Sequence, residues 1–350
     1  MKFLLSLSLI LTGCACPFNQ PQTKAYPKNQ VIQKITDDSV GTAFKSIHPK
    51  RIVVIIAEPG TGKILAMTAR REGSNKQTDD AVSWESEPGS TFKPVVVVAA
   101  LQEGKITQNT EINCEQGAFP LGGKVIKDQG KYGNLTFEEI LMRSSNIGAA
   151  KLSLLLKDSV YSDYVYRFGF GTKTGINVKG ESTGIVYPPE RWDPLTKARM
   201  SFGQSVAVTP IQLTMAYCAL ANGGKLMKPV TGNEKPTVIR RVCSKKTADL
   251  VKNALAKVAS DKGTAPLARV NGVTVGGKTG TSQVITPDGH YADDKFVTSF
   301  AGLLPVDHPK YVCVVVVDQA DLPPEKNYGG VVAAPIFAEI AGKIRDAQIK

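Results

Sequence analysis

The chain has 350 residues and a formal net charge of +12, with 43 lysines and arginines against 31 aspartates and glutamates. This length accommodates one large domain or two moderate ones. No stretch of the sequence is apolar enough for long enough to predict a membrane-spanning helix. The basic residues are spread along the chain without an aromatic-interleaved cluster, which argues against nucleic acid as the partner. A membrane surface or an anionic polymer fits this charge better.

The N-terminal residues have the pattern of a secretion signal. Lys2 precedes a short apolar run over residues 3–11, which is the order of a signal peptide. The run ends in Leu-Thr-Gly-Cys at 11–14, which resembles the lipobox of bacterial lipoproteins. That resemblance implies cleavage after residues 1–13 and lipidation of Cys14, which would anchor the protein to a membrane peripherally. The alternative is an ordinary secretion signal with a chance cysteine, and both interpretations place the protein outside the cytoplasm.

Residues 14–30 are rich in Pro, Gln, Asn and Lys, and we predict a flexible tether there, followed by one domain over 31–348. Apolar periodicity and capping residues predict the elements of this domain. Helices are expected over 31–47, from about 90 to 104, and over 136–143, 147–157, 209–222, 244–260 and 333–345. Strands are expected over 51–57, 64–69, 273–275, 296–304 and 311–317, with glycine-rich loops over 104–134 and 169–189. Strands at both ends with helices between them predict an α/β layered domain that carries a helical subdomain.

Ser90-Thr91-Phe92-Lys93 is the only Ser-x-x-Lys in the chain. A serine hydroxyl is a poor nucleophile at neutral pH unless a base lies within hydrogen-bond reach. Residues three apart on a helix share one face, and Pro94 is tolerated only in a first turn. We therefore predict a helix that begins at or just before Ser90, with Lys93 beside the hydroxyl and the positive end of the helix dipole at the nucleophile.

Two further motifs follow in chain order. Ser144-Ser145-Asn146 falls in the break between two expected helices, and Lys278-Thr279-Gly280 lies on or beside a strand after Gly276-Gly277. Ser-x-x-Lys, Ser-x-Asn and Lys-Thr-Gly in this order form the signature of penicillin-binding proteins and serine β-lactamases. Each motif alone is more often an ordinary cap or turn, whereas the ordered set predicts a catalytic site.

Flanking stretches make the resemblance more specific. The chain resembles the transpeptidase domain of class B penicillin-binding proteins, in particular their division and sporulation types. The matching stretches are 87–94, 142–148, 168–171, 205–210, 277–281 and 328–335. The resemblance implies a β-lactamase/transpeptidase-like α/β fold, with an antiparallel sheet flanked by helices and an inserted all-α subdomain. It also implies D-Ala–D-Ala stem peptides of peptidoglycan as substrate, β-lactams as covalent inhibitors, cell-wall synthesis or division proteins as partners, and neither metal nor cofactor.

The resemblance assigns a role to each catalytic position. Ser90 would be acylated, Lys93 would take its proton, and Ser144 would relay a proton to the leaving amine. Asn146 would hold the substrate amide and orient the lysine. A lysine at its usual pKa of about 10.4 is protonated, and lowering that pKa by about 3 units requires about 4 kcal/mol against the charged form. Burial, the helix N-terminus and a second cation, Lys278, would supply this free energy.

The predicted strand would bind the substrate. Thr279, and with it Thr281, would bind the substrate carboxylate next to Lys278. Gly280 would let the strand backbone approach the acyl group closely. The backbone N–H groups of Ser90 and Thr281 would form the oxyanion hole.

Other site classes fit the sequence less well. Residues 272–279 match the P-loop spacing, but no strand precedes them and Pro287 precludes the helix that a P-loop needs. A Ser-His-Asp hydrolase is disfavoured because only His48, His290 and His308 are available and no G-x-S-x-G is present.

Proteins of the same fold provide the closer alternatives. A class A β-lactamase would carry a Glu-x-x-Leu-Asn motif for deacylation, which is absent, and class D enzymes usually carry Ser-x-Val where residues 144–146 read Ser-Ser-Asn. A D,D-carboxypeptidase or a penicillin-sensing protein stays open. Class B members also usually carry an N-terminal pedestal domain and a transmembrane anchor, for which residues 14–30 leave no room. We therefore expect the usual partner of the pedestal to be replaced by another activator.

Four cysteines lie beyond the leader. They have no metal-ligand spacing, and they are Cys114, Cys218, Cys243 and Cys313. We expect Cys218 and Cys313, which lie in apolar runs, to be buried as small hydrophobes. A disulfide among the four stays open, because pairing cannot be read from sequence.

Lipidation gives the first testable prediction. Cys14→Ser should move the protein from the membrane fraction to the soluble fraction, because the thiol that carries the lipid is lost. Cys16→Ser is the matched control and should fractionate as the unmodified sequence does. A Cys14→Ser protein that stays in the membrane fraction would refute lipidation.

Overall fold

The computed structural model describes residues 30–74 and 77–348. The predicted signal peptide, the lipidation site Cys14 and the predicted tether up to residue 29 lie outside the described residues. Among the helices of the described part, none has both the length and the apolar character needed to cross a membrane.

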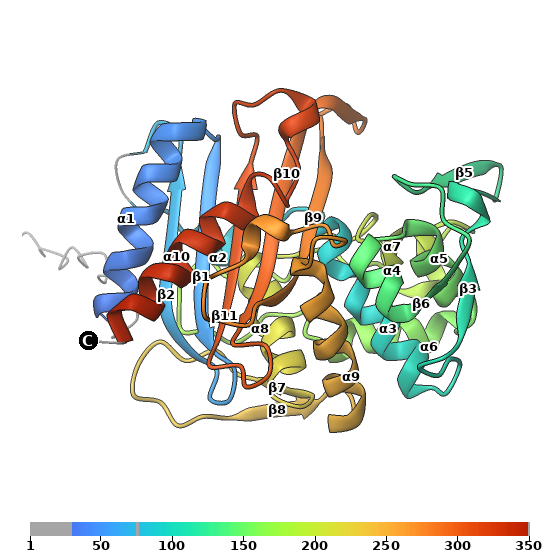
Figure 1. Cartoon of the computed structure of the whole chain (residues 1–350), viewed down its shortest axis with the longest axis horizontal. Coiled ribbons are helices and arrows are strands. Elements are labelled where there is room, and N and C mark those ends of the chain that lie inside the picture. Colours follow the sequence, from blue (N-terminus) through green and yellow to red (C-terminus); the bar gives the residue numbers. More distant parts are fainter. Residues whose placement is uncertain (1–29, 75–76, 349–350) are drawn as a thin grey trace, which may run out of the picture.

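A five-stranded sheet forms the centre of the molecule (Figure 1). Its order is β2–β1–β11–β10–β9, and every neighbouring pair is antiparallel. The strands are β1 (Arg51–Glu58), β2 (Lys63–Arg71), β9 (Gly276–Ile285), β10 (Tyr291–Leu304) and β11 (Tyr311–Asp318). The first two strands of the chain therefore join the last three in one sheet, and β9 is left at an edge.

Both faces of the sheet are covered, which explains why β1 and β11 are continuous apolar runs. Alternate residues of a strand point to opposite faces. Val53 and Ile55 enter a core on one face, while Ile52 and Val54 enter a second core on the other. A strand buried on both sides needs apolar residues at every position, and this is the pattern the sequence shows.

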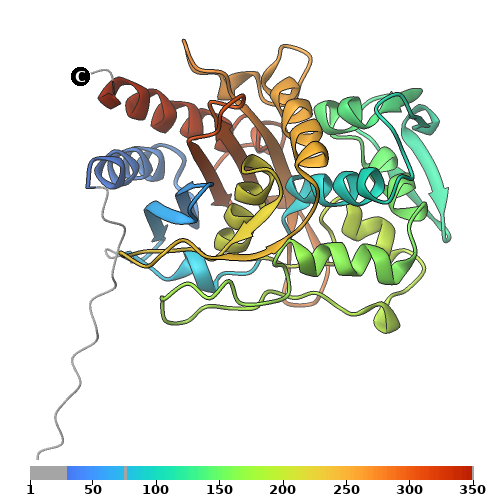
Figure 2. The ribbon, with the colours of Figure 1, turned by 90° about the horizontal axis from the view of Figure 1, so that it is seen from below.

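The first and last helices cover one face of the sheet. They are α1 (Gln30–Ile47) and α10 (Ala333–Gln348), and they pack on each other and on the strands (Figures 1 and 2). Helix α8 (Pro210–Ala221) packs on the other face against β1 and β11. It begins with a capping box between Thr209 and Gln212 and is apolar nearly all round, as a fully buried helix must be.

The remaining helices gather beyond the edge strand β9 (Figure 1). They are α3 (Lys93–Gln102), α4 (Phe137–Arg143), α5 (Asn146–Leu154), α6 (Asp158–Arg167), α7 (Thr196–Ser201) and α9 (Lys245–Ala256), with the short α2 (Asp80–Ser83) nearer the sheet. The described residues also form three two-stranded ribbons. These pair β3 (Glu111–Asn113) with β6 (Asn134–Thr136), β4 (Ala118–Leu121) with β5 (Lys124–Lys127), and β7 (Lys225–Met227) with β8 (Val238–Arg241).

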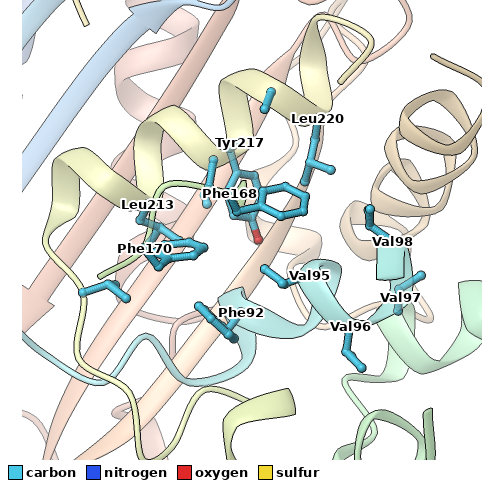
Figure 3. Close-up of a cluster of buried hydrophobic side chains, with 14 of the residues drawn as sticks. Phe92, Val95, Val96, Val97, Val98, Phe168, Phe170, Leu213, Tyr217 and Leu220 are labelled. Carbon is cyan, nitrogen blue, oxygen red and sulfur yellow. The ribbon is translucent and has the colours of Figure 1, made fainter. Parts of the chain in front are cut away.

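An aromatic cluster between α3 and α8 joins the helical region to the sheet (Figure 3). The rings of Phe92 and Phe170 lie 4.8 Å apart between centroids, in a tilted arrangement. The buried hydroxyl of Tyr217 donates to the carbonyl of Thr91 at 2.9 Å. Because Thr91 and Phe92 directly follow Ser90, this cluster fixes the position of the turn that carries the serine.

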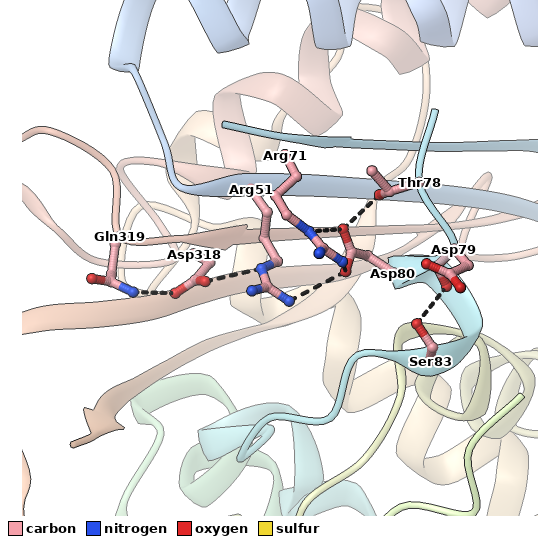
Figure 4. A network of polar contacts seen from close by, with 8 residues as sticks. All are labelled: Arg51, Arg71, Thr78, Asp79, Asp80, Ser83, Asp318 and Gln319. Atoms are coloured by element: carbon pink, nitrogen blue, oxygen red, sulfur yellow. Dashed lines mark hydrogen bonds and ion pairs between the residues drawn. The ribbon is translucent and has the colours of Figure 1, made fainter. Parts of the chain in front are cut away.

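A buried ion-pair network links three strands to α2 (Figure 4). The Asp80 carboxylate accepts hydrogen bonds from Arg71 Nε at 3.1 Å and Thr78 Oγ1 at 2.5 Å, and it pairs with Arg51 at 3.3 Å. Arg51 also pairs with Asp318 at 3.1 Å. Burial raises the pKa of Asp80, but the hydrogen bonds and the two guanidinium groups outweigh it, so the net pKa is lowered. The network therefore holds a charged carboxylate at the end of the sheet where β1 begins and β2 and β11 end.

The α/β architecture predicted from sequence is confirmed, as are most of its elements. The hairpin of β1 and β2, the strands β10 and β11 and the helices α1, α4, α8, α9 and α10 lie within a few residues of their predicted bounds, except that β10 begins earlier. Cys218 and Cys313 are buried as expected, and all four cysteines of the described residues are unbridged.

The helix predicted to begin at or just before Ser90 does begin there, as a 3₁₀ turn over Gly89–Phe92 that runs into the α-helix at Lys93. Three other predictions about local structure are wrong. Residues 273–275 are not a strand, since Val273 only forms a bridge with Val270 across a tight turn, and β9 starts at Gly276. The expected loop 104–134 contains β3, β4 and β5. For the same reason the inserted subdomain is not all-α: these short strands pair among themselves and with β6 inside the helical region.

Candidate active site

Ser90 and Lys93 meet where the 3₁₀ turn runs into α3. Lys93 Nζ lies 2.5 Å from Ser90 Oγ. In a 3₁₀ turn residues i and i+3 eclipse each other, so the tight turn places the amine directly over the hydroxyl. Pro94 occupies the first turn of α3, where its missing N–H costs no helical hydrogen bond.

The second motif forms the junction between α4 and α5. Ser144 ends α4 in a left-handed conformation with φ of 60°. Ser145 caps α5 by accepting from the N–H of Gly148 at 2.9 Å, and Asn146 is the first residue of that helix. Lys93 Nζ donates to Asn146 Oδ1 at 2.7 Å and lies 3.4 Å from Ser144 Oγ. The Lys93 amine therefore contacts side chains of both the first and the second motif.

The third motif approaches from the edge strand β9. Lys278 Nζ donates to Ser144 Oγ at 2.8 Å and to the carbonyl of Thr279 at 3.2 Å. The hydroxyls of Thr279 and Thr264 lie 2.7 Å apart. Within the described residues β9 pairs with β10 alone, and β9 also contacts the 3₁₀ turn that carries Ser90.

Two glycines allow the strand and the serine turn to touch. A Cβ on Gly280 would lie 2.7 Å from the carbonyl oxygen of Pro88, and a Cβ on Gly89 would lie 2.8 Å from that of Thr281. Neither distance is compatible with a side chain. The approach of the turn before Ser90 requires glycine at 280 in this structure, and the predicted close approach of an acyl group at the same residue stays a prediction. The backbones of residues 89 and 281 lie against each other, as an oxyanion hole between residues 90 and 281 requires.

The electrostatics of the site are those of two buried amines. Lys93 and Lys278 are both fully buried. Burial lowers the pKa of Lys93 to about 7, against an opposing effect of the nearby Asp128 carboxylate. Burial, and then repulsion from Lys93, lower the pKa of Lys278 well below its ordinary value. At neutral pH the pair therefore disfavours two full positive charges, which leaves an uncharged amine beside a serine hydroxyl.

Asp128 organises the Ser144–Asn146 junction, and sequence reasoning missed it. Its carboxylate accepts from Ser145 Oγ at 2.6 Å and from the N–H groups of Asn146 and Ile147 at 2.5 and 3.1 Å. Asn146 Nδ2 in turn donates to the carbonyl of Lys127 at 3.0 Å. A carboxylate on the first N–H groups of a helix is favoured by the helix dipole. Asp128 lies in a stretch expected to be a loop, where nothing in the sequence marked it.

Glu87 is a second residue that the sequence analysis did not single out, although it stands in a matching stretch. The carboxyl is mostly buried, accepts from the N–H of Ser205 at 2.8 Å and receives the Tyr291 hydroxyl at 3.1 Å. Burial raises the pKa of Glu87 to about 7, although these hydrogen bonds oppose it. The group ties β10 and the segment around Ser205 to the turn that carries Ser90.

A cleft of about 840 Å³ opens over these groups. Ser90, Ser144, Asn146, Thr279 and Thr281 all line it, whereas the two lysines lie beneath its floor. The structure thus brings together every site residue predicted within the described part of the chain. The floor of the cleft combines a serine hydroxyl with a lysine amine, which is the arrangement of a nucleophile and its general base.

The antiparallel sheet with Lys-Thr-Gly on its edge strand, set beside a Ser-x-x-Lys turn, defines the penicillin-interacting fold class. Residues 52–342 match the family model described as "Penicillin binding protein transpeptidase domain". The chain belongs to this family.

Named relatives agree with this assignment. The chain is 34% identical to stage V sporulation protein D of Bacillus subtilis, over 88% of this chain and 51% of the relative. It is 32% identical to peptidoglycan D,D-transpeptidase FtsI of Escherichia coli K12, over 83% of this chain and 50% of the relative. The chain spans about half the length of these curated relatives.

Solved structures are similar over most of both chains. The transpeptidase domain of Burkholderia pseudomallei penicillin-binding protein 3 superposes with a TM-score of 0.84 at 31% identity, covering 93% of this chain and 96% of that domain. Apo penicillin-binding protein 3 of Mycobacterium tuberculosis gives a TM-score of 0.81 at 30% identity, covering 91% of this chain and 78% of that one. The fold expected from the sequence motifs is therefore confirmed.

Removing the Asp128 carboxylate tests its role at the junction. Asp128→Ala should lower the free energy of unfolding by about 2–3 kcal/mol, because three donors lose their acceptor. Asp163→Ala, which removes only the exposed pair with Arg167, is the control and should cost about 0.5 kcal/mol or less. Urea unfolding measures both variants, and equal midpoints would contradict the assigned role.

Proposed function

We propose that this chain is a serine D,D-transpeptidase that cross-links peptidoglycan stem peptides through an acyl-enzyme on Ser90. The observation that carries the proposal is the 2.5 Å contact between Ser90 Oγ and the buried Lys93 amine, whose pKa is lowered to about 7. The name of the relative FtsI of Escherichia coli, a peptidoglycan D,D-transpeptidase, supports the same reaction. The structures of Mycobacterium tuberculosis penicillin-binding protein 3 with aztreonam and with ampicillin support β-lactams as ligands.

Acylation begins with proton transfer from serine to lysine. The uncharged Lys93 accepts the hydroxyl proton while Ser90 Oγ attacks the carbonyl of the penultimate D-Ala. The backbone N–H groups of Ser90 and Thr281 stabilise the oxyanion, and each such donor is typically worth about 10²–10³ in rate. The amide bond then breaks, and the terminal D-Ala leaves as an amine after receiving a proton through the Ser144 hydroxyl.

Ser144 is suited to that relay by its position between both amines. Its oxygen lies 2.8 Å from Lys278 Nζ and 3.4 Å from Lys93 Nζ. A proton taken up by Lys93 passes to Ser144 Oγ as the Ser144 hydroxyl proton passes to the leaving amine. The proton taken from Ser90 therefore reaches the leaving amine through Lys93 and Ser144, without passing through solvent.

The edge strand binds the donor peptide. The Thr279 and Thr281 hydroxyls bind the terminal carboxylate beside the Lys278 amine, and the backbone at Gly280 lies against the serine turn. The Asn146 side chain holds the donor amide and keeps Lys93 oriented. In the second half-reaction an amine of another stem peptide attacks the ester, Lys93 takes its proton, and Ser90 is released.

The proposed substrate lies outside the cytoplasm. We infer that a lipid on Cys14 anchors the domain of residues 31–348 to a membrane surface, with residues 14–30 as the tether. The Leu-Thr-Gly-Cys pattern at 11–14 supports the anchor, and the family match over 52–342 supports the domain. We further propose other cell-wall synthesis proteins as partners, in keeping with relatives named for sporulation and for peptidoglycan transpeptidation.

Covalent labelling tests the nucleophile. Fluorescent penicillin should label the protein in a denaturing gel, Ser90→Ala should abolish the band, and Lys93→Ala should reduce it to background because the base is lost. Ser159→Ala, at an exposed position of α6, is the matched control and should label fully. A band that survives Ser90→Ala would assign the nucleophile elsewhere.

The pH dependence tests the base. The second-order rate of penicillin acylation should rise with pH through about 7 and level off above it, because the reactive form of Lys93 is uncharged. Asp128→Asn should move this rise to lower pH, because the nearby carboxylate that raises the pKa of Lys93 is lost. Stopped-flow acylation between pH 5.5 and 9.5 measures both profiles. A flat profile for the unmodified protein would rule out a base of this pKa.

A further inference from the structure

One wall of the active-site cleft is the hairpin of β4 and β5. Its strands pair from Ala118 with Lys127 to Leu121 with Lys124. The two-residue turn is Gly122-Gly123, with φ of 53° and 74°, which is the backbone that the tightest hairpins need. A Cβ on Gly122 would lie 2.9 Å from the side chain of Leu195, so the tip of the hairpin packs on the segment before α7.

The hairpin is held at its base as well as at its tip. Asn146 Nδ2 donates to the carbonyl of Lys127 at 3.0 Å. Lys151 lies 4.7 Å from the ring of Phe119 on β4 and pairs with Glu115 at 2.5 Å. The backbone of β5 is therefore fixed relative to the catalytic Asn146.

The charge of the cleft has one sign. The charged residues that line it in the described part of the chain are Lys124, Lys127 and Arg199, and no carboxylate lines it. Arg199 is paired with Asp193 at 3.2 Å. Lys124 and Lys127 are exposed, and the described residues give neither side chain an ion pair. Two lysines without anionic partners at the mouth of a cleft attract an anionic group of the ligand.

We propose that Lys124 and Lys127 bind a second carboxylate of the donor peptide, upstream of the reacting bond, and make the enzyme selective for donors in which that carboxylate is free. The inference rests on the proposed function. The terminal carboxylate already has Lys278 and Thr279, so this wall serves a different anion. Asn146, which holds the donor amide in the proposed mechanism, also holds the backbone of Lys127. Donor residues before the reacting bond therefore pass along β5.

The test compares two synthetic N-acetylated peptides ending in D-Ala–D-Ala, identical except that an interior glutamate carboxylate is free in one and amidated in the other. The readout is the ratio of kcat/KM for the two donors with one amine acceptor. The unmodified protein should prefer the free carboxylate, and K124Q/K127Q should reduce the preference about 5-fold, as the loss of two exposed ion pairs predicts. The preference should also shrink as salt is added.

K225Q/K246Q removes the same charge at two exposed positions outside the cleft lining and should keep the full preference. Full labelling of each variant by saturating penicillin establishes that it is folded. An unchanged ratio in K124Q/K127Q would overturn the inference while leaving the proposed function in place. A protein that neither reacts with penicillin nor consumes either donor would overturn the proposed function, and the inference with it.

Discussion

The active site depends on burying two lysine amines, those of Lys93 and Lys278, on either side of the Ser144 hydroxyl. Lys93 and Lys278 are fully buried, and Ser144 Oγ lies within 3.4 Å of both amines. Moving the pKa of a lysine from 10.5 to about 7 corresponds to about 5 kcal/mol against its charged form. The folded chain supplies this free energy through burial, which outweighs the opposing effect of Asp128, and the resulting uncharged amine gives Ser90 its base.

Three distant parts of the chain have to meet for this to happen, and the fold provides one support for each. The aromatic cluster and the Tyr217 hydroxyl fix the turn after Ser90, Asp128 fixes the junction around Ser144, and pairing with β10 fixes the strand of Lys278. The small residues Gly89 and Gly280 then let turn and strand touch. The sheet and the helices thus hold the site residues in place, and a general base needs this because it must stay within hydrogen-bond reach of the nucleophile.

Much of this arrangement was predictable from local sequence signals. Capping boxes at Thr136 and Thr209 set the starts of α4 and α8, and ordered short motifs named the site residues. What failed depended on tertiary context. The strands β3, β4 and β5 are too short to show periodicity, and they form only by pairing with one another and with β6. Asp128 gained its role only through contacts across 17 residues to Ser145, and no local pattern encodes such a contact.

The pKa of Lys93 itself is the most direct test of this account. Protein labelled with ¹³C at the lysine ε-carbons, with the Lys93 signal assigned by its loss in Lys93→Arg, gives that pKa from the change in chemical shift with pH. The account predicts a midpoint near 7 for Lys93, far below that of the exposed lysines. A midpoint near 10 would mean that the amine beside Ser90 is charged at neutral pH, and the proposed chemistry would then lack its base.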